Sequence, residues 1–202
     1  MNILNIKDIK DKVRLDPLEI SLNNNKSNKL VIFLCNPASK NGITNEKEDY
    51  TIRWIKNNLN LTEYKSFIIL NIISSIEKNL ENIKISNELT INDINYYHNI
   101  NKEKINNVLL TNNISTILFA CGQHFIQSKC KHMSKYYKDF FIDIYNILYQ
   151  YKNILYCLEY TKKCILIGNK NIKLPYFPSN RKKKNMTLDN NNKIKLKKYN
   201  YI

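Results

Sequence analysis

Residues Leu30 to Asn41 read L-V-I-F-L-C-N-P-A-S-K-N, and this stretch decides the expected fold. Its first six residues are apolar, and the run stops at Asn36-Pro37. A short apolar run that ends at a turn dipeptide predicts a buried strand. Ligands of open α/β sheets bind just outside the carboxyl ends of the strands. Asn36 is therefore a candidate functional residue, with an ordinary strand-ending turn as the alternative.

Three further runs are similar in length and in their content of branched side chains. They predict a short, mainly parallel central sheet, because they do not alternate clearly between apolar and polar residues. Amphipathic segments between them predict helices on both faces, so the expected fold is α/β, a three-layer α/β/α domain. The expected strands are 30–35, 67–73, 115–120 and 154–158, with 164–167 extending or pairing with the last, and the expected helices are 50–59, 92–110 and 124–151.

The chain has 202 residues, which suffices for one domain of this kind. We expect a polar N-terminal extension at 1–29, the α/β domain at 30–180 and a basic C-terminal tail at 181–202. For the tail, a basic extension that follows a phosphate backbone and a disordered segment are the two alternatives.

The formal net charge is +15, which favours phosphate-bearing partners and nucleic acid in particular. A codon bias toward lysine and a role in solubility are the alternatives. The five cysteines form no C-x-x-C pair, so we expect reduced thiols, no metal and no cofactor. A charged N-terminus and the lack of an apolar run of membrane-spanning length predict a cytoplasmic protein with no membrane partner.

Several short motifs, taken in order, resemble known families. The N-P at 36–37 and the late P-Y-F-P-S at 175–179 resemble the uracil-DNA glycosylase superfamily, closest to its mismatch-specific and thymine-DNA glycosylase branch. The chain is also similar to a bacterial and phage domain family of unknown function with the pattern N-P-S-x-A, D-x-T-x-R, N-L, W-G, H-P. The corresponding elements are N-P-A-S at 36–39, D-Y-T-I-R at 49–53, N-I at 71–72, C-G at 121–122 and F-P at 177–178.

The resemblance implies a monofunctional DNA glycosylase that excises a damaged, mismatched or modified base, with phage-modified DNA as one target. By this resemblance Asn36 holds the attacking water, and Asp49 is a second candidate for catalysis as a general base. Asp49 also suits the N-cap of the helix that follows it. The residues that the resemblance assigns to substrate binding are Pro37, Arg53, Asn71, Gly122 and His124.

The resemblance also implies contacts with duplex or single-stranded DNA from which a base is flipped out. Phe177 is the wedge candidate, and its neighbours hold the backbone. The full set of expected DNA-binding residues is Phe177, Pro178, Ser179, Arg181, Lys182 and Lys183. The chain departs from the family patterns where Cys121 replaces a tryptophan and Phe177 replaces a histidine. We expect a monomer.

Two other functions fit the same motifs. One is a non-catalytic module of glycosylase-like fold that binds DNA or a modified nucleotide. The other is a hydrolase of free nucleosides. The binding module remains an alternative because this chain has Phe177 and Cys121 where the related patterns have a histidine and a tryptophan.

Overall fold

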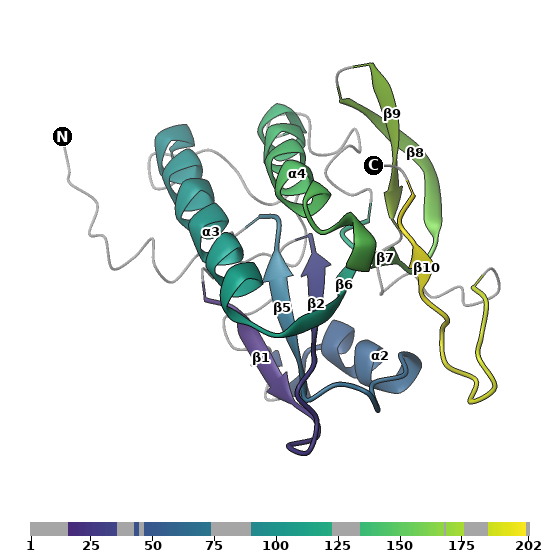
Figure 1. The fold of residues 1–202 in the computed structure, drawn as a ribbon. Helices are drawn as coiled ribbons and strands as arrows, with labels where there is room; N and C mark the ends of the chain where they lie inside the picture. Colours follow the sequence, from purple (N-terminus) through teal and green to yellow (C-terminus); the bar gives the residue numbers. More distant parts are fainter. Residues whose placement is uncertain are drawn as a thin grey trace.

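The structure is a computed structural model that describes residues 16–35, 43–44, 47–73, 90–122, 134–167, 169–175 and 186–200. Its centre is a six-stranded sheet with the strand order β1-β5-β2-β6-β7-β10 (Figure 1). The four inner strands run parallel, and β1 and β10 pair antiparallel at the two edges. The strands are β1 (Leu18–Ser21), β2 (Lys29–Leu34), β5 (Ser66–Asn71), β6 (Ile114–Phe119), β7 (Leu155–Cys157) and β10 (Lys197–Lys198).

The four runs expected to form the central sheet all do so, and they are its four parallel strands. The chain therefore has a mixed α/β fold. The sheet as a whole is mixed rather than purely parallel, because the edge strands come from the segments expected to be an extension and a tail. Leu18–Ser21 alternates between half-buried and exposed side chains, as an edge strand with one solvated face does.

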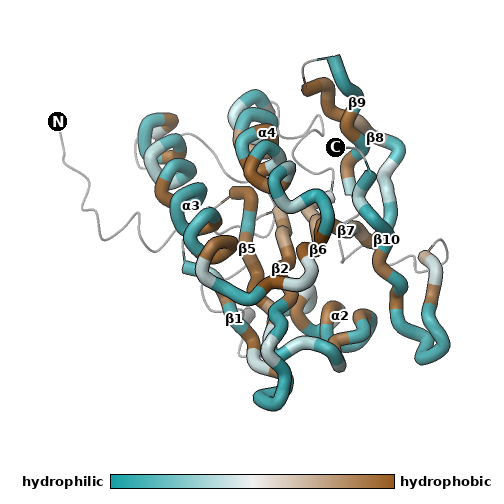
Figure 2. Tube along the Cα trace, in the orientation of Figure 1, coloured by the Kyte–Doolittle hydropathy of each residue, from teal (hydrophilic) through white to brown (hydrophobic). Residues whose placement is uncertain are grey.

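Hydrophobic side chains cover both faces of the sheet. Val31 and Phe33 of β2 point into a core shared with α3 (Ile91–Thr111) and α4 (Ser134–Tyr149). Leu30 and Ile32 point into a second core shared with α2 (Tyr50–Asn58). Figure 2 shows this apolar centre as brown stretches along the inner strands, with hydrophilic residues in the turns around them.

Two small hairpins lie outside the main sheet. β3 (Ile43–Thr44) pairs with β4 (Lys47–Glu48), and β8 (Tyr160–Ile167) pairs with β9 (Lys170–Pro175). The expectation that 164–167 extends or pairs with the last sheet strand is wrong, because this run belongs to β8. A 3-10 turn, η4 (Lys152–Ile154), precedes β7.

The C-terminal residues 186–200 pack against the domain. Met186, Ile194 and Tyr199 are buried, and β10 pairs with β7. Within the described part of the chain, none of the helices is both long and apolar enough to cross a membrane.

Candidate functional site

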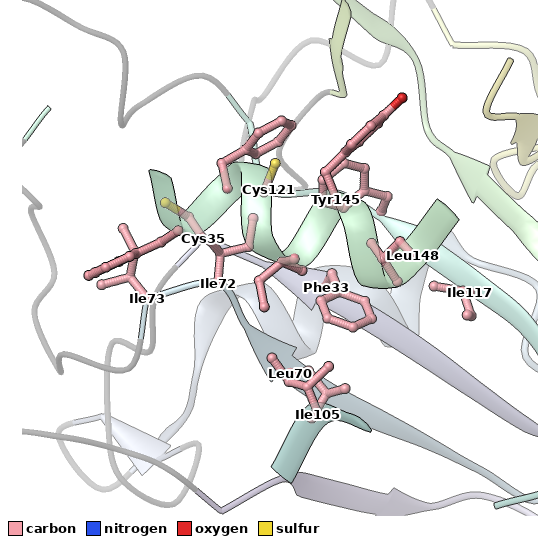
Figure 3. Close-up of a cluster of buried hydrophobic side chains, with 14 of the residues drawn as sticks. Phe33, Cys35, Leu70, Ile72, Ile73, Ile105, Ile117, Cys121, Tyr145 and Leu148 are labelled. Carbon is pink, nitrogen blue, oxygen red and sulfur yellow. The ribbon is translucent and has the colours of Figure 1, made fainter. Parts of the chain in front are cut away.

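The carboxyl ends of the parallel strands meet at one edge of the sheet. The backbone N–H of Ile73 donates to the carbonyl of Cys35 at 2.8 Å, and that of Ala120 donates to Phe33 at 2.9 Å. Figure 3 shows Phe33, Cys35 and Cys121 packed with side chains of α4. The chain thus leaves β2, β5 and β6 on the same side, and Cys35 and Gly122 are the last described residues before the segments that hold Asn36 and His124.

Asn71 is the last residue of β5 at this edge, two residues before the end of the expected strand 67–73, and it is only 5% exposed. Its backbone carbonyl accepts a hydrogen bond from Asn101 Nδ2 at 2.8 Å. Its side-chain oxygen Oδ1 is buried and has no hydrogen-bond partner among the described residues. Leaving a buried acceptor unsatisfied costs about 1–3 kcal/mol. Asn71 therefore carries a buried acceptor whose loss of hydration no described residue offsets, which makes it a candidate binding residue.

Gly122 follows β6 at the same edge and has a backbone φ of 74°. This left-handed conformation is strained for a residue with a Cβ atom, and glycine adopts it freely. The neighbouring Cys121 is fully buried, and burial raises the pKa of its thiol well above the ordinary value. Cys121 is therefore a packing residue that stays protonated, whereas Gly122 supplies the positive φ that the chain adopts as it leaves β6.

A buried histidine lies between the two helices that cover this side of the sheet. His98 of α3 places Nε2 3.1 Å from Asp143 Oδ2 of α4, and its ring stacks on Phe140 with the centroids 3.8 Å apart. Lys102 Nζ donates to the same carboxylate oxygen at 2.9 Å. The other ring nitrogen of His98, Nδ1, is buried and has no hydrogen-bond partner in the part of the chain that the structure describes.

The pKa values of His98 and Asp143 follow from their surroundings. Burial lowers the pKa of His98 and outweighs the opposing effect of Asp143. Burial alone raises the pKa of Asp143, but hydrogen bonds from Lys102 and His98 more than offset it, so this pKa lies below its usual value. The cluster therefore favours a neutral imidazole beside an ionised carboxylate.

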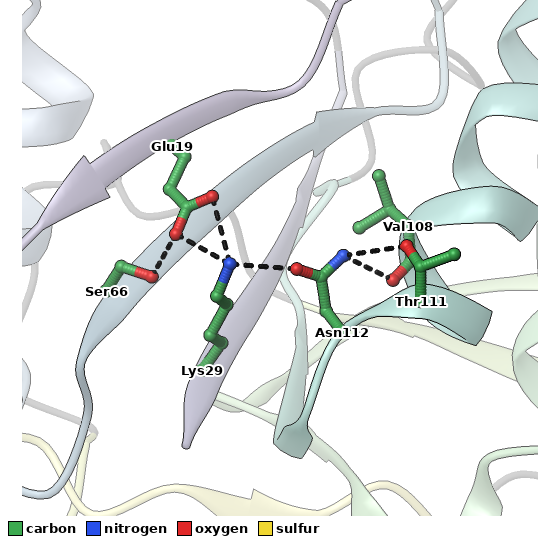
Figure 4. Close-up of polar contacts among 6 residues, drawn as sticks. All are labelled: Glu19, Lys29, Ser66, Val108, Thr111 and Asn112. Atoms are coloured by element: carbon green, nitrogen blue, oxygen red, sulfur yellow. Dashed lines mark hydrogen bonds and ion pairs between the residues drawn. The ribbon is translucent and has the colours of Figure 1, made fainter. Parts of the chain in front are cut away.

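The opposite end of the sheet carries a polar network whose groups are paired (Figure 4). Lys29 Nζ lies 2.9 Å from Glu19 Oε1 and donates to Asn112 Oδ1 at 2.8 Å. Ser66 donates its hydroxyl to Glu19, and Asn112 Nδ2 donates to the carbonyl of Val108 at 2.8 Å. Burial raises the pKa of Glu19, but the hydrogen bonds from Ser66 and Lys29 lower it below its ordinary value. This end of the sheet is tied together internally.

A groove of about 700 Å³ lies on the α2 side near the first residues of the inner strands. Tyr64, Thr116 and Tyr156 are among the residues that line it, and Tyr64 donates its hydroxyl to Thr116 at 3.0 Å. The groove is therefore distinct from the carboxyl edge that holds Asn71 and Gly122. In the described ranges, no three histidine, cysteine, aspartate or glutamate side chains gather as metal ligands would.

Two other residues predicted to belong to the site lie on α2. Asp49 is the N-cap, since its Oδ1 accepts the backbone N–H of Thr51 at 2.7 Å. The capping role considered for Asp49 is thus confirmed. Arg53 is exposed one turn later, next to Ile52 and Trp54, which are buried. The remaining predicted residues lie outside the described part of the chain: Asn36, Pro37, His124, Phe177, Pro178, Ser179, Arg181, Lys182 and Lys183.

The sequence model of one protein family matches residues 18–165 of the chain, from β1 into β8. That family is described as a protein of unknown function, DUF1643. The chain belongs to the DUF1643 family. No curated protein and no solved structure matches it. The expected relation to the uracil-DNA glycosylase superfamily remains a prediction, because DUF1643 carries no assigned activity.

The DUF1643 segment also contains three polar residues on α3 and α4 that no motif marks: His98, Asn101 and Asp143. The first two continue a helical apolar stripe that includes Ile94 and Ile105, and both are buried. A polar residue at a core position of an amphipathic helix signals a buried polar group. That pattern is the signal by which His98 and Asn101 are detectable. Asp143 carries no such signal, because it is found only through its contact with His98.

Proposed function

We propose that this DUF1643 protein is a monofunctional DNA glycosylase that hydrolyses the N-glycosidic bond of a damaged, mismatched or modified base. The observation that carries the proposal is the buried Oδ1 of Asn71, unpartnered among the described residues, at the carboxyl edge of the sheet. A flipped base is recognised by hydrogen bonds to its Watson–Crick edge inside a closed pocket. An amide supplies an acceptor for such a contact without any change of protonation.

The other features of this edge support the same activity. Gly122 permits the backbone to approach the base or the sugar, and the adjacent strand β2 leads into the segment that contains Asn36 and Pro37. In the proposed reaction the bond between C1′ and the base nitrogen breaks, and a water held by Asn36 adds to C1′. The departing base takes a proton. The glycosylase-like three-layer arrangement belongs to this proposal and rests on the coverage of both sheet faces.

The proposed substrate is duplex DNA from which the target base is extruded. A net charge of +15 suits a partner with a phosphate backbone. Phe177 is the proposed wedge, and the basic residues after it are proposed to hold the backbone of the strand. Asp49 is assigned to capping, with general-base catalysis kept as a role to be tested.

The test is base release from a panel of duplexes that each carry one modified or mismatched base. After incubation, alkali treatment converts abasic sites to strand breaks, and free base is measured in parallel. Alkali-labile breaks in wild-type reactions, lost in Asn36→Ala at unchanged DNA affinity, are the expected result. Binding without breaks identifies a non-catalytic module, and release from free nucleosides without DNA identifies a nucleoside hydrolase.

A further inference from the structure

The β8–β9 hairpin presents one buried and one exposed face. Ile165, Ile172 and Leu174 belong to the main hydrophobic core, so the hairpin is fixed to the domain. The outward side carries Lys162 and Lys173, which are exposed, and Cys164 pairs with Lys173 across the two strands. The exposed lysines of the hairpin therefore lie on a segment that is packed against the core.

The positive charge of the molecule is concentrated in and beyond this hairpin. Residues 160–175 contain four lysines and no acidic residue. Residues 166–202, which lie beyond the DUF1643 match, carry ten lysines and arginines against one aspartate, a net of +9 out of +15. Most of the excess charge thus belongs to about a fifth of the chain.

The acidic side chains nearest in sequence are already engaged. Glu159 forms an ion pair with Lys197, and Asp189 accepts the backbone N–H groups of Asn191 at 3.0 Å and Lys193 at 2.8 Å. Among the described residues, no acidic side chain pairs with Lys162 or Lys170. The hairpin therefore keeps a local positive field that a phosphate can neutralise.

Hydrogen bonds join the lysine-rich hairpin to the lysine-containing C-terminal segment. Tyr199 donates its hydroxyl to the carbonyl of Lys173 at 2.6 Å, and Tyr160 donates to the carbonyl of Lys198 at 2.7 Å. Figure 1 shows β8 and β9 rising on the side toward which the arrowheads of β2 and β5 point. The hairpin therefore extends toward the same side of the sheet as the carboxyl ends of these strands (Figure 1).

We propose that the exposed lysines of the β8–β9 hairpin, Lys162 and Lys173 on its outward face and Lys170 beside its turn, bind the phosphate backbone of duplex DNA. This inference rests on the proposed function, because the hairpin is proposed as the surface that binds the DNA substrate of the glycosylase. We choose duplex DNA over a membrane because the exposed face offers little apolar surface. It is a hydrogen-bonded ribbon, and Leu166 is the large apolar side chain exposed on it. Membrane association would need a broader apolar face.

The test compares two triple variants with equal loss of charge. The hairpin variant is Lys162→Gln/Lys170→Gln/Lys173→Gln. The control variant is Lys26→Gln/Lys56→Gln/Lys104→Gln, whose lysines pair with Glu63, Glu48 and Asp16. All six side chains lie at the surface or are half-buried, and thermal melts of both proteins verify that they fold. The readout is fluorescence anisotropy with an unmodified duplex across a salt series.

We expect the DNA affinity of the hairpin variant to fall at least about tenfold at 100 mM salt. The slope of log affinity against log salt concentration should become shallower by about 2–3, because each lost phosphate contact removes about 0.9 from it. The control variant should lose far less. Equal losses in both variants would overturn the proposal. So would a wild-type protein that ignores DNA but binds phosphatidylserine vesicles through the same lysines, or one that prefers duplex RNA.

Binding is measured on unmodified DNA, so its outcome is separate from that of excision. A flattened slope without base release from any substrate supports the surface and rejects the proposed activity. Base release with an unchanged slope in the hairpin variant rejects the surface and leaves the activity in place.

Discussion

The two ends of the parallel strands differ in how their buried polar groups are satisfied. At the amino end, Lys29, Glu19, Ser66 and Asn112 bind one another. At the carboxyl end, Asn71 Oδ1 is buried and lacks a partner among the described residues, as does Nδ1 of His98 on the helix above it. Native proteins pair nearly all such groups, and exceptions gather at functional sites. The contrast separates an end whose polar groups are paired from an end with buried acceptors that no described residue pairs, and we propose that the second end binds the ligand.

The largest expected effect comes from Asn71→Leu. We expect the rate of base release to fall by roughly 10²-fold or more, because one positioned hydrogen-bonding group in an active site is worth about that much. The free energy of unfolding should stay the same or rise, since the substitution removes an unsatisfied buried acceptor. Single-turnover excision and urea denaturation measure the two quantities. An active but destabilised variant would place Asn71 among the structural residues.

The matched substitution at the other end is Asn112→Leu. It removes the acceptor of Lys29 and the donor to Val108, so we expect a loss of about 1–3 kcal/mol in the free energy of unfolding. Excision at a temperature where the variant is folded should match the wild type. Denaturation and excision are measured in parallel with Asn71→Leu. A large loss of excision in the folded variant would abolish the distinction between the two ends.

A smaller effect is expected at Asp49, and it separates two roles. Asp49→Ala should cost about 1 kcal/mol of stability because the cap of α2 is lost, whereas Asp49→Ser keeps a capping oxygen and should cost little. If Asp49 only caps the helix, the serine variant excises bases at the wild-type rate. Excision that fails in both variants alike would instead assign general-base catalysis to the carboxylate.

The smallest expected effect is on the pH dependence of stability. The folded pKa of His98 lies below its ordinary value of 6.5, so the unfolded chain binds more protons and stability falls as the pH drops below about 6.5. The folded pKa of Glu19 lies below its ordinary 4.5, so its contribution is lost only as the pH falls below that value. Thermal melts from pH 7 to 3 should show both windows. His98→Gln should flatten the fall in stability below pH 6.5. Glu19→Gln should flatten the fall below pH 4.5 in part, because Asp143, whose folded pKa is also lowered, contributes there too.

The four inner strands could be predicted because each lies in a short, mostly apolar run. Strands β2 and β5 are buried along nearly their whole length, whereas β6 and β7 are partly half-buried. Edge strands β1 and β10 have few residues and mixed polarity, so their pairing depends on partners distant in sequence. The family resemblance assigned Asn71 and Gly122 to substrate binding, and both lie at one edge of the sheet. The contact of His98 with Asp143 could not be predicted, because it depends on how α3 packs against α4.

The most direct test of the central claim is chemical-shift mapping with isotope-labelled protein and a duplex whose target nucleotide carries a 2′-fluoro group that slows cleavage. The side-chain amides of Asn71 and Asn112 are matched probes of the two ends of the sheet. We expect large shifts at the Asn71 side chain and the Gly122 backbone, with the Asn112 side chain unmoved. Shifts that gather instead at Asn112 or around the groove lined by Tyr64 and Thr116 would contradict the assignment of the carboxyl edge as the functional site.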